Sequence, residues 1–108
     1  MNKIKKRSGL AGMLALCATA CTVMAGVGEG KQVFADKKCV TCHSLGDQKG
    51  AAAQLGGALD HVGSQRDAEW LKSYLFDPKS KRPDAKMPKQ QLTDKELDDL
   101  VAYLVNLQ

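Results

Sequence analysis

The stretch Cys39-Val40-Thr41-Cys42-His43 decides how this chain of 108 residues folds. It places two thiols three positions apart and an imidazole directly after the second. A disulfide between the two cysteines would close a loop too short to stabilise a domain. A thioredoxin-like redox pair requires a βαβ unit, and the sequence shows no strand pattern. A zinc site requires four ligands, and His61 is the only histidine or cysteine after the stretch.

The same spacing is typical of a covalent attachment site for haem c. Two thiols one helical turn apart can each add to a vinyl group on one porphyrin edge. The next residue, His43, is then held beneath the iron as an axial ligand. Residues 26–108 would form only a small core of their own, and a covalently bound haem would fill it. The sequence therefore predicts one haem c, attached through Cys39 and Cys42.

The other axial ligand has two candidates, Met87 and His61. Met87 is the only methionine after residue 25, and it lies in a stretch, 77–91, that contains all three prolines. A thioether ligand favours ferrous iron and raises the reduction potential relative to a second histidine. His61 lies in a glycine-rich stretch where a surface role is typical. We therefore expect His43 and Met87 to be the iron ligands.

Residues 1–25 are predicted to be an export signal. Four basic residues precede Ser8, and an uncharged run then extends to Gly28. It contains Val23-Met24-Ala25, whose first and last residues suit a signal peptidase. Two alternatives stay open: a lipoprotein signal with lipid on Cys21, and an uncleaved membrane anchor. All three place the domain, residues 26–108, outside the cytoplasm, in the periplasm or otherwise exported.

The charge distribution argues against a nucleic-acid binder. Beyond the basic N-terminus, 12 Lys and Arg balance 12 Asp and Glu. Within 72–89, however, bases outnumber acids, and the acids Asp94, Glu96, Asp98 and Asp99 follow directly. This dipolar pattern favours a redox partner with an acidic docking surface, and we expect a monomer.

Helical spacing predicts an all-α domain of three to four short helices. The first is expected over about 30–38. The second is expected to begin near Ser64, with Asp67 completing the cap, and to end before Pro78. The last begins at Thr93, where 93–96 forms a capping box. Its buried face comprises four residues at helical spacing: Leu97, Leu100, Val101 and Leu104.

Residues 26–108, with these motifs, resemble the class I cytochrome c family in its small bacterial exported type. Gly30 and Phe34 look like the family's contact residues in the first helix, and Leu100 and Tyr103 look like their partners in the last. The resemblance implies three to four short helices wrapped around one covalent haem.

The resemblance also suggests how the haem pocket is lined. The spacing of Tyr74 and Met87 is similar to the family's, which implies that the Tyr74 hydroxyl lies near the sulfur. Many relatives have Gly-Pro after the attachment motif, near a carbonyl that accepts the Nδ1 proton of the axial histidine. Here the matching stretch, 55–59, reads Leu-Gly-Gly-Ala-Leu, with both leucines expected to point inward, and the accepting carbonyl stays open. Arg66 and Trp70 are candidate donors to the haem propionates, with solvent exposure and core packing as their alternatives.

These observations favour an electron carrier over an enzyme. Two axial ligands leave the iron no open position for a substrate, and no acid–base or nucleophile constellation occurs elsewhere. We predict a monohaem cytochrome that carries single electrons between redox partners of a respiratory chain. A dedicated cytochrome subunit of a membrane reductase or oxidase is the alternative. A five-coordinate haem enzyme or gas sensor is less favoured, because its architecture places the attachment motif near the C-terminus.

Overall fold

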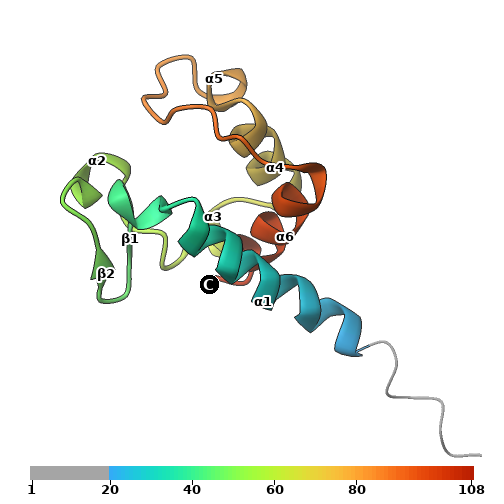
Figure 1. Cartoon of the computed structure of the whole chain (residues 1–108). Coiled ribbons are helices and arrows are strands. Elements are labelled where there is room, and N and C mark those ends of the chain that lie inside the picture. Colours follow the sequence, from blue (N-terminus) through green and yellow to red (C-terminus); the bar gives the residue numbers. More distant parts are fainter. Residues whose placement is uncertain (1–19) are drawn as a thin grey trace, which may run out of the picture.

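The structure, a computed structural model, describes the backbone of residues 20–108 and the side chains from Gly26 onward. The chain runs through helix α1 (Ala20–Asp36), the 3₁₀ helix η1 (Cys39–Thr41), strands β1 (Ser44–Leu45) and β2 (Gln48–Lys49), and helices α2 (Ala53–Gly56), α3 (Val62–Gln65), α4 (Ala68–Phe76), α5 (Pro78–Lys81) and α6 (Asp94–Val105). The three longest helices, α1, α4 and α6, form the body of the molecule (Figure 1). The all-α prediction is confirmed, since β1 and β2 pair over only two residues each.

Helices α1 and α6 cross at a glycine. A Cβ atom on Gly30 would overlap the carbonyl oxygen of Asp99 and lie 2.6 Å from the Cβ of Tyr103, so no larger residue fits. One turn further on, the rings of Phe34 and Tyr103 meet edge to face, with their centroids 5.6 Å apart. Leu100 is 1% exposed, the most deeply buried side chain described. The predicted pairing of the first and last helices is confirmed.

Helix α1 begins at Ala20, well before the expected start near residue 30, and ends at Asp36. It therefore runs through the predicted cleavage point after Ala25, and the remainder of the predicted export signal lies outside the described residues. Within the described part of the chain, no helix is long and apolar enough to cross a membrane. Export and cleavage stay predictions.

The start of α4 differs from the sequence prediction. Ser64 lies in the separate turn α3, whereas Asp67 is the N-cap of α4 and accepts a hydrogen bond from the Trp70 N–H at 2.8 Å. The backbone of Asp67 is extended (φ −83°, ψ 173°), as an N-cap requires. The helix ends at Phe76 as predicted, because the proline at 78 forces the preceding residue into an extended conformation.

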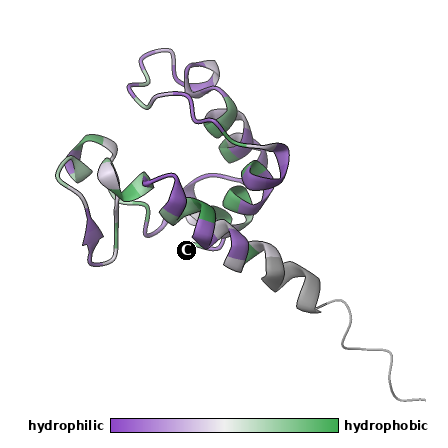
Figure 2. Cartoon of the chain, viewed as in Figure 1, coloured by the Kyte–Doolittle hydropathy of each residue, from purple (hydrophilic) through white to green (hydrophobic). Residues whose placement is uncertain are grey.

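The capping box that opens α6 is confirmed. The Glu96 N–H donates to the Thr93 hydroxyl at 3.1 Å, and the Thr93 N–H donates to the Glu96 carboxylate at 2.9 Å. All four residues predicted for the buried face of α6 lie in the core, where α1, α4 and α6 meet. Figure 2 shows hydrophobic positions on these helices where they face one another.

Two segments extend from this core (Figure 1). We call residues 39–59, with η1, β1, β2 and α2, the His43 arm, and residues 77–92, with α5, the Met87 arm. Leu59 packs against the core, as expected. Leu55, also expected to point inward, is 76% exposed, so that expectation was wrong.

Candidate haem-binding site

A sharp turn after α1 presents the two thiols and the imidazole. Lys38 adopts a left-handed backbone conformation (φ 57°, ψ 42°), the only non-glycine residue in the described chain with a positive φ. This conformation ends α1 and directs the chain into η1. The N–H groups of Cys42 and His43 both donate to the Cys39 carbonyl, at 3.3 and 3.1 Å. The attachment motif therefore closes on itself as one turn, as its spacing predicts.

Both thiols of this turn are free and half-buried. Burial raises the pKa of the Cys39 thiol, which keeps it protonated at neutral pH. The side chains described from Gly26 onward include no group of three or more His, Cys, Asp or Glu residues that could hold a metal ion. Two free, half-buried thiols on one turn are compatible with a group that is attached covalently.

His43 is oriented by a main-chain carbonyl. Its ring Nδ1 lies 3.2 Å from the carbonyl oxygen of Gly57, which also accepts the Ser44 N–H at 3.1 Å. A carbonyl can only accept, so Nδ1 carries a proton, and in the neutral ring Nε2 then keeps the free lone pair. Such a bond fixes both the tautomer and the direction of a ligating histidine. The carbonyl left open by the sequence is that of Gly57.

The two adjacent glycines have different reasons to be glycine. Gly57 has φ 75° and ψ −177°, a conformation essentially restricted to glycine. Gly56 packs against the histidine itself: a Cβ atom there would lie 2.5 Å from the His43 Cε1 atom and would overlap the Cys42 carbonyl. The Gly56 N–H donates to that carbonyl at 2.6 Å. Together they let the chain pass directly beside the imidazole.

The two candidates for the second axial ligand lie in different environments. Met87 lies in the irregular part of the Met87 arm, is half-buried and packs against the core. His61 is exposed at the residue before α3. The Met87 arm and the His43 arm leave the core as separate segments (Figure 1).

Arg66, which lies just before α4, forms one stack with Trp70 and Tyr74 of that helix. The Arg66 guanidinium lies 4.3 Å from the centroid of the Trp70 ring. The Trp70 and Tyr74 rings stack at 4.9 Å with an interplanar angle of 11°. Within residues 26–108, neither the Trp70 Nε1–H nor the Tyr74 hydroxyl has a hydrogen-bond partner. The structure thus brings the three predicted pocket residues together and leaves their polar atoms available.

Comparison with known proteins covers the same region. The model of the cytochrome c family matches residues 27–108, which include the attachment turn, the His43–Gly57 contact and the crossing at Gly30. The chain belongs to the cytochrome c family. Its helical architecture is compatible with the class I fold, and haem c is the cofactor that the family implies. An electron carrier is the function that the match supports.

Two curated proteins resemble this cytochrome. Cytochrome c2 of Rhodoplanes tepidamans is 32% identical over 89 residues, which cover 63% of this chain and 81% of the relative. Cytochrome c oxidase subunit 2 of Alkalihalophilus pseudofirmus is 27% identical over 88 residues, which cover 73% of this chain and 25% of the relative. This cytochrome therefore spans about a quarter of the oxidase subunit's length. No solved structure matches the chain significantly.

Gly56 and Gly57 are the site residues of this cytochrome whose roles the sequence did not reveal. The signal was the pair of glycines at the position where relatives have Gly-Pro. A glycine pair, however, is equally typical of an ordinary turn. Only the position of the His43 ring shows that one glycine makes room and the other supplies the carbonyl.

Proposed function

We propose that this cytochrome is an exported single-haem electron carrier. Its haem c is attached through Cys39 and Cys42, and the iron is ligated by His43 and Met87. The observation that supports this most directly is the bond from His43 Nδ1 to the Gly57 carbonyl, because it leaves Nε2 free for iron. The haem supplies a one-electron couple, and the chain holds and orients it.

Met87 is favoured over His61 because it is half-buried on the core while His61 is exposed. Pro83 and Pro88 restrict the backbone on both sides of Met87, which lowers the entropy lost when its sulfur is held in one place. Arg66, Trp70 and Tyr74 offer hydrogen-bond donors within one stack. The Arg66 guanidinium and the Trp70 indole N–H suit carboxylates such as the haem propionates.

The test of the ligands compares two variants of the haem-loaded protein. Met87→Ala is expected to open the sixth position, lower the reduction potential and let ferrous iron bind carbon monoxide readily. His61→Ala is the control and is expected to leave the spectrum unchanged. The ferric wild type is expected to show the near-infrared band of sulfur ligation. Loss of that band in His61→Ala rather than Met87→Ala would contradict the assignment.

Covalent attachment is tested by mass. The protein is expected to gain the mass of one haem that survives denaturation, and the double variant Cys39→Ser/Cys42→Ser is expected to lose it. Haem that is extracted from the intact protein by acidified organic solvent would contradict attachment.

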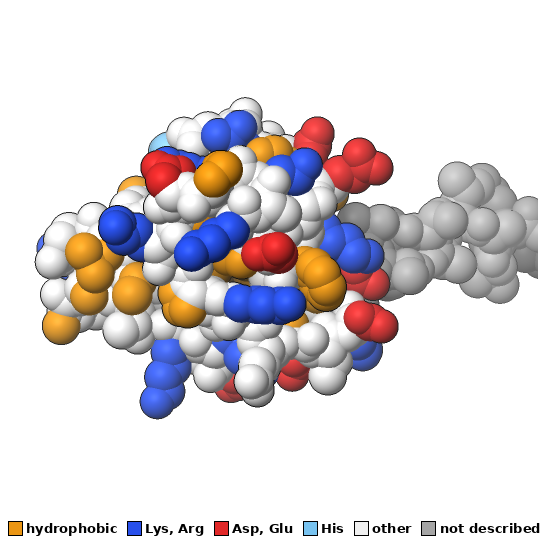
Figure 3. All heavy atoms as spheres, turned by 90° about the horizontal axis from the view of Figure 1, so that it is seen from above, with side chains coloured by type: hydrophobic (Ala, Val, Ile, Leu, Met, Phe, Trp, Pro, Cys, Tyr) orange, Lys and Arg blue, Asp and Glu red, His pale blue; other side chains and the backbone are white. Residues whose placement is uncertain are grey.

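For the partner, we propose a redox protein with an acidic docking surface. The bases of the stretch 72–89 are mainly exposed: Lys72, Lys79, Lys81, Arg82, Lys86 and Lys89. Figure 3 shows a face on which Lys and Arg side chains lie among hydrophobic ones, with carboxylates denser towards the undescribed residues. A positive surface of this kind speeds association at low salt. Rates of electron transfer to the native partner that do not change with ionic strength would exclude this docking mode.

Two further points concern the location of the protein and its assembly. Cleavage after Ala25 is tested by the N-terminus of the exported protein; lipid on Cys21 or an intact N-terminus would identify the alternatives.

The oxidase subunit among the relatives supports a second candidate, a cytochrome that works as a dedicated subunit of a membrane complex. Gentle detergent extraction followed by purification of the haem protein distinguishes it from a free carrier.

A further inference from the structure

Phe76, the last residue of α4, is 62% exposed. It is not part of the buried face of that helix, which is formed by Leu71 and Leu75. The ammonium of Lys89 lies over its ring, with Nζ 4.9 Å from the centroid. We propose that this contact holds the C-terminal end of the Met87 arm against α4, which makes Phe76 a positioning residue for Met87. This inference rests on the proposed ligation of iron by Met87.

The two ends of the Met87 arm are fixed differently. At the N-terminal end, the Asp77 N–H donates to the Ser73 carbonyl at 2.9 Å, and the Ser80 hydroxyl donates to the Asp77 carbonyl at 2.6 Å. At the C-terminal end, no backbone N–H of residues 86–92 donates to another backbone group of the described chain. Side chains therefore have to hold the end that carries Met87.

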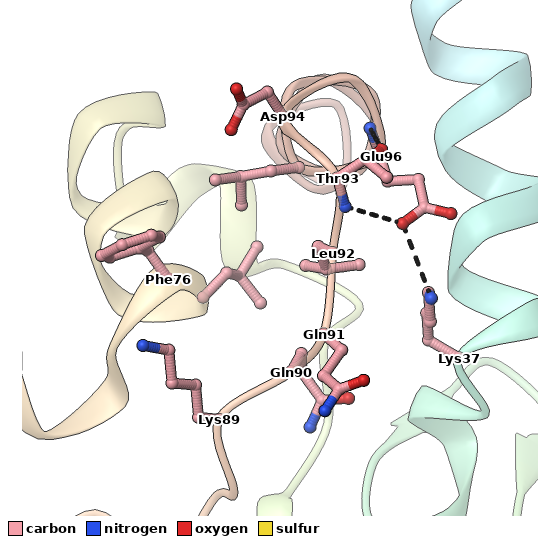
Figure 4. A pocket seen from close by; sticks show the side chains of 11 residues that line it. Lys37, Phe76, Lys89, Gln90, Gln91, Leu92, Thr93, Asp94 and Glu96 are labelled. Carbon is pink, nitrogen blue, oxygen red and sulfur yellow. Dashed lines mark hydrogen bonds and ion pairs between the residues drawn. The ribbon is translucent and has the colours of Figure 1, made fainter.

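Lys89 is close enough to Met87 along the chain for a contact at Lys89 to restrict the position of the Met87 sulfur. It follows Met87 by two residues and precedes Leu92, which packs on the core, by three. Lys89 and Phe76 both line a groove of about 570 Å³, and Figure 4 shows the ammonium end of Lys89 directed towards Phe76. Lys37 and Glu96 lie on the opposite side of the same groove (Figure 4). Release of Lys89 would remove a contact two residues from Met87 on its C-terminal side and leave the packing of Met87 and Leu92 on the core, together with the N-terminal end of the arm.

The expected size of the effect follows from the contact. An exposed cation–π pair changes an equilibrium by about two- to fivefold. The equilibrium that matters is between two states: Met87 bound to the iron, and Met87 replaced there by a ligand added from solution. Removing the contact between Phe76 and Lys89 destabilises the first state, so the protein binds the added ligand about two- to fivefold more tightly. Global stability changes little, because the exposed Phe76 ring contributes little buried surface.

The experiment titrates the ferric haem-loaded protein with imidazole and follows the loss of the sulfur–iron band in the near infrared. The variants are Phe76→Leu, which keeps an apolar side chain without a ring, Lys89→Gln, and the double variant. Leu55→Ala is the matched control for an exposed apolar side chain, and Lys86→Gln for a charge in the same arm. Phe76→Trp and Lys89→Arg test rescue, and urea unfolding is measured on every variant.

Each single variant is expected to bind imidazole about two- to fivefold more tightly than the wild type, and the double variant no more tightly than either. Phe76→Trp and Lys89→Arg are expected to keep wild-type affinity. Single variants that match the controls, or effects that multiply in the double variant, overturn the positioning role while Met87 ligation stands. A wild type without the sulfur band, or Met87→Ala with unchanged imidazole affinity, overturns the ligand assignment and this inference with it.

Discussion

The His43 arm and the Met87 arm both consist of turns and short elements, with one two-stranded pair in the His43 arm, but they are held in different ways. In the His43 arm, hydrogen bonds join backbone groups that are distant along the chain. The Gly50 N–H donates to the Val40 carbonyl at 2.7 Å, and the Leu59 N–H donates to the Ser44 carbonyl at 2.9 Å. The carbonyl that orients His43 belongs to this network.

The Met87 arm has only local backbone bonds. The Arg82 N–H donates to the Pro78 carbonyl at 3.0 Å, and the Ala85 N–H donates to the Arg82 carbonyl at 2.9 Å. Beyond residue 85, side-chain packing and Pro88 restrict the chain. Regions without backbone bonds open at lower free energy than regions with them. We therefore expect the histidine side of the site to stay fixed while the methionine side opens.

The largest expected difference between the arms comes from deleting each ligand. His43→Ala removes the proposed iron ligand and the bond to Gly57, and we expect the yield of haem-loaded protein to fall to less than about a tenth, because the domain has little core without haem. Met87→Ala is expected to keep at least about half of that yield, because the His43 arm is unchanged. Haem-stained denaturing gels of the exported fraction measure both. Equal losses would show that the arms contribute equally.

A methyl group beside the histidine is the next test. Gly56→Ala forces a Cβ atom against the His43 ring, and we expect a loss of about 1–3 kcal/mol in the free energy of unfolding. Gly46→Ala is the control for backbone strain alone: its φ is positive, at 54°, whereas that of Gly56 is not, and a Cβ atom there meets nothing within 4 Å. We expect it to cost about 1 kcal/mol from backbone strain alone. Urea unfolding of both haem-loaded variants gives the comparison, and a larger loss at Gly46 would contradict it.

Hydrogen exchange compares the arms without any mutation. The amides of Ser44, Gly50 and Gly56 donate to backbone carbonyls, and we expect them to exchange at least about 100-fold more slowly than unprotected amides. The amides of 86–92, apart from Pro88, are expected to exchange at rates close to those of an unfolded chain. Nuclear magnetic resonance of the reduced protein measures the exchange rate of each amide. Slow exchange of the amides of 86–92 would contradict the expected difference between the two arms.

The smallest effect concerns pH at the junction of the Met87 arm with α6. The Thr93 N–H, together with the Lys37 ammonium, holds the pKa of Glu96 below its usual range. A lowered pKa in the folded state means stability that is present above the unfolded value, near 4.3, and is lost as pH falls through the folded value. The wild type should therefore lose slightly more thermal stability than Glu96→Gln between about pH 5 and 3.

Thermal unfolding followed by circular dichroism across this range makes the measurement. Asp84→Asn is the control, because the Asp84 side chain is 81% exposed and lies 4.0 Å from its nearest base. It should follow the wild type closely. A wild type that parallels Glu96→Gln would show that the capping box contributes nothing that depends on pH.

Contiguous signals were predictable from the sequence. The capping box at 93–96 and the turn at 39–43 each involve neighbouring residues, so their chemistry can be recognised without knowing the fold. The start of α4 was not predictable, because Ser64 and Asp67 are both good caps. The structure selects Asp67 because the Gly63 N–H donates to the Leu107 carbonyl at 2.7 Å, which holds α3 as a separate turn against the chain end.

The glycine pair illustrates the same limit at the site. A glycine permits either sign of φ, so no local rule could assign the conformation of Gly57. Its conformation follows from the position of the His43 ring, which the fold brings to it from the attachment turn. The extent of α1 was also missed, because the residues before Gly30 were interpreted as the end of an export signal.

The crossing at Gly30 also has a consequence for how the molecule is made. Its partners, Asp99 and Tyr103, lie in the last helix, so the first contact region of the domain is synthesised long before the surface it packs against. Closing a loop of about 70 residues is entropically costly and slow compared with local contacts. The core therefore closes only when the last helix packs on the first.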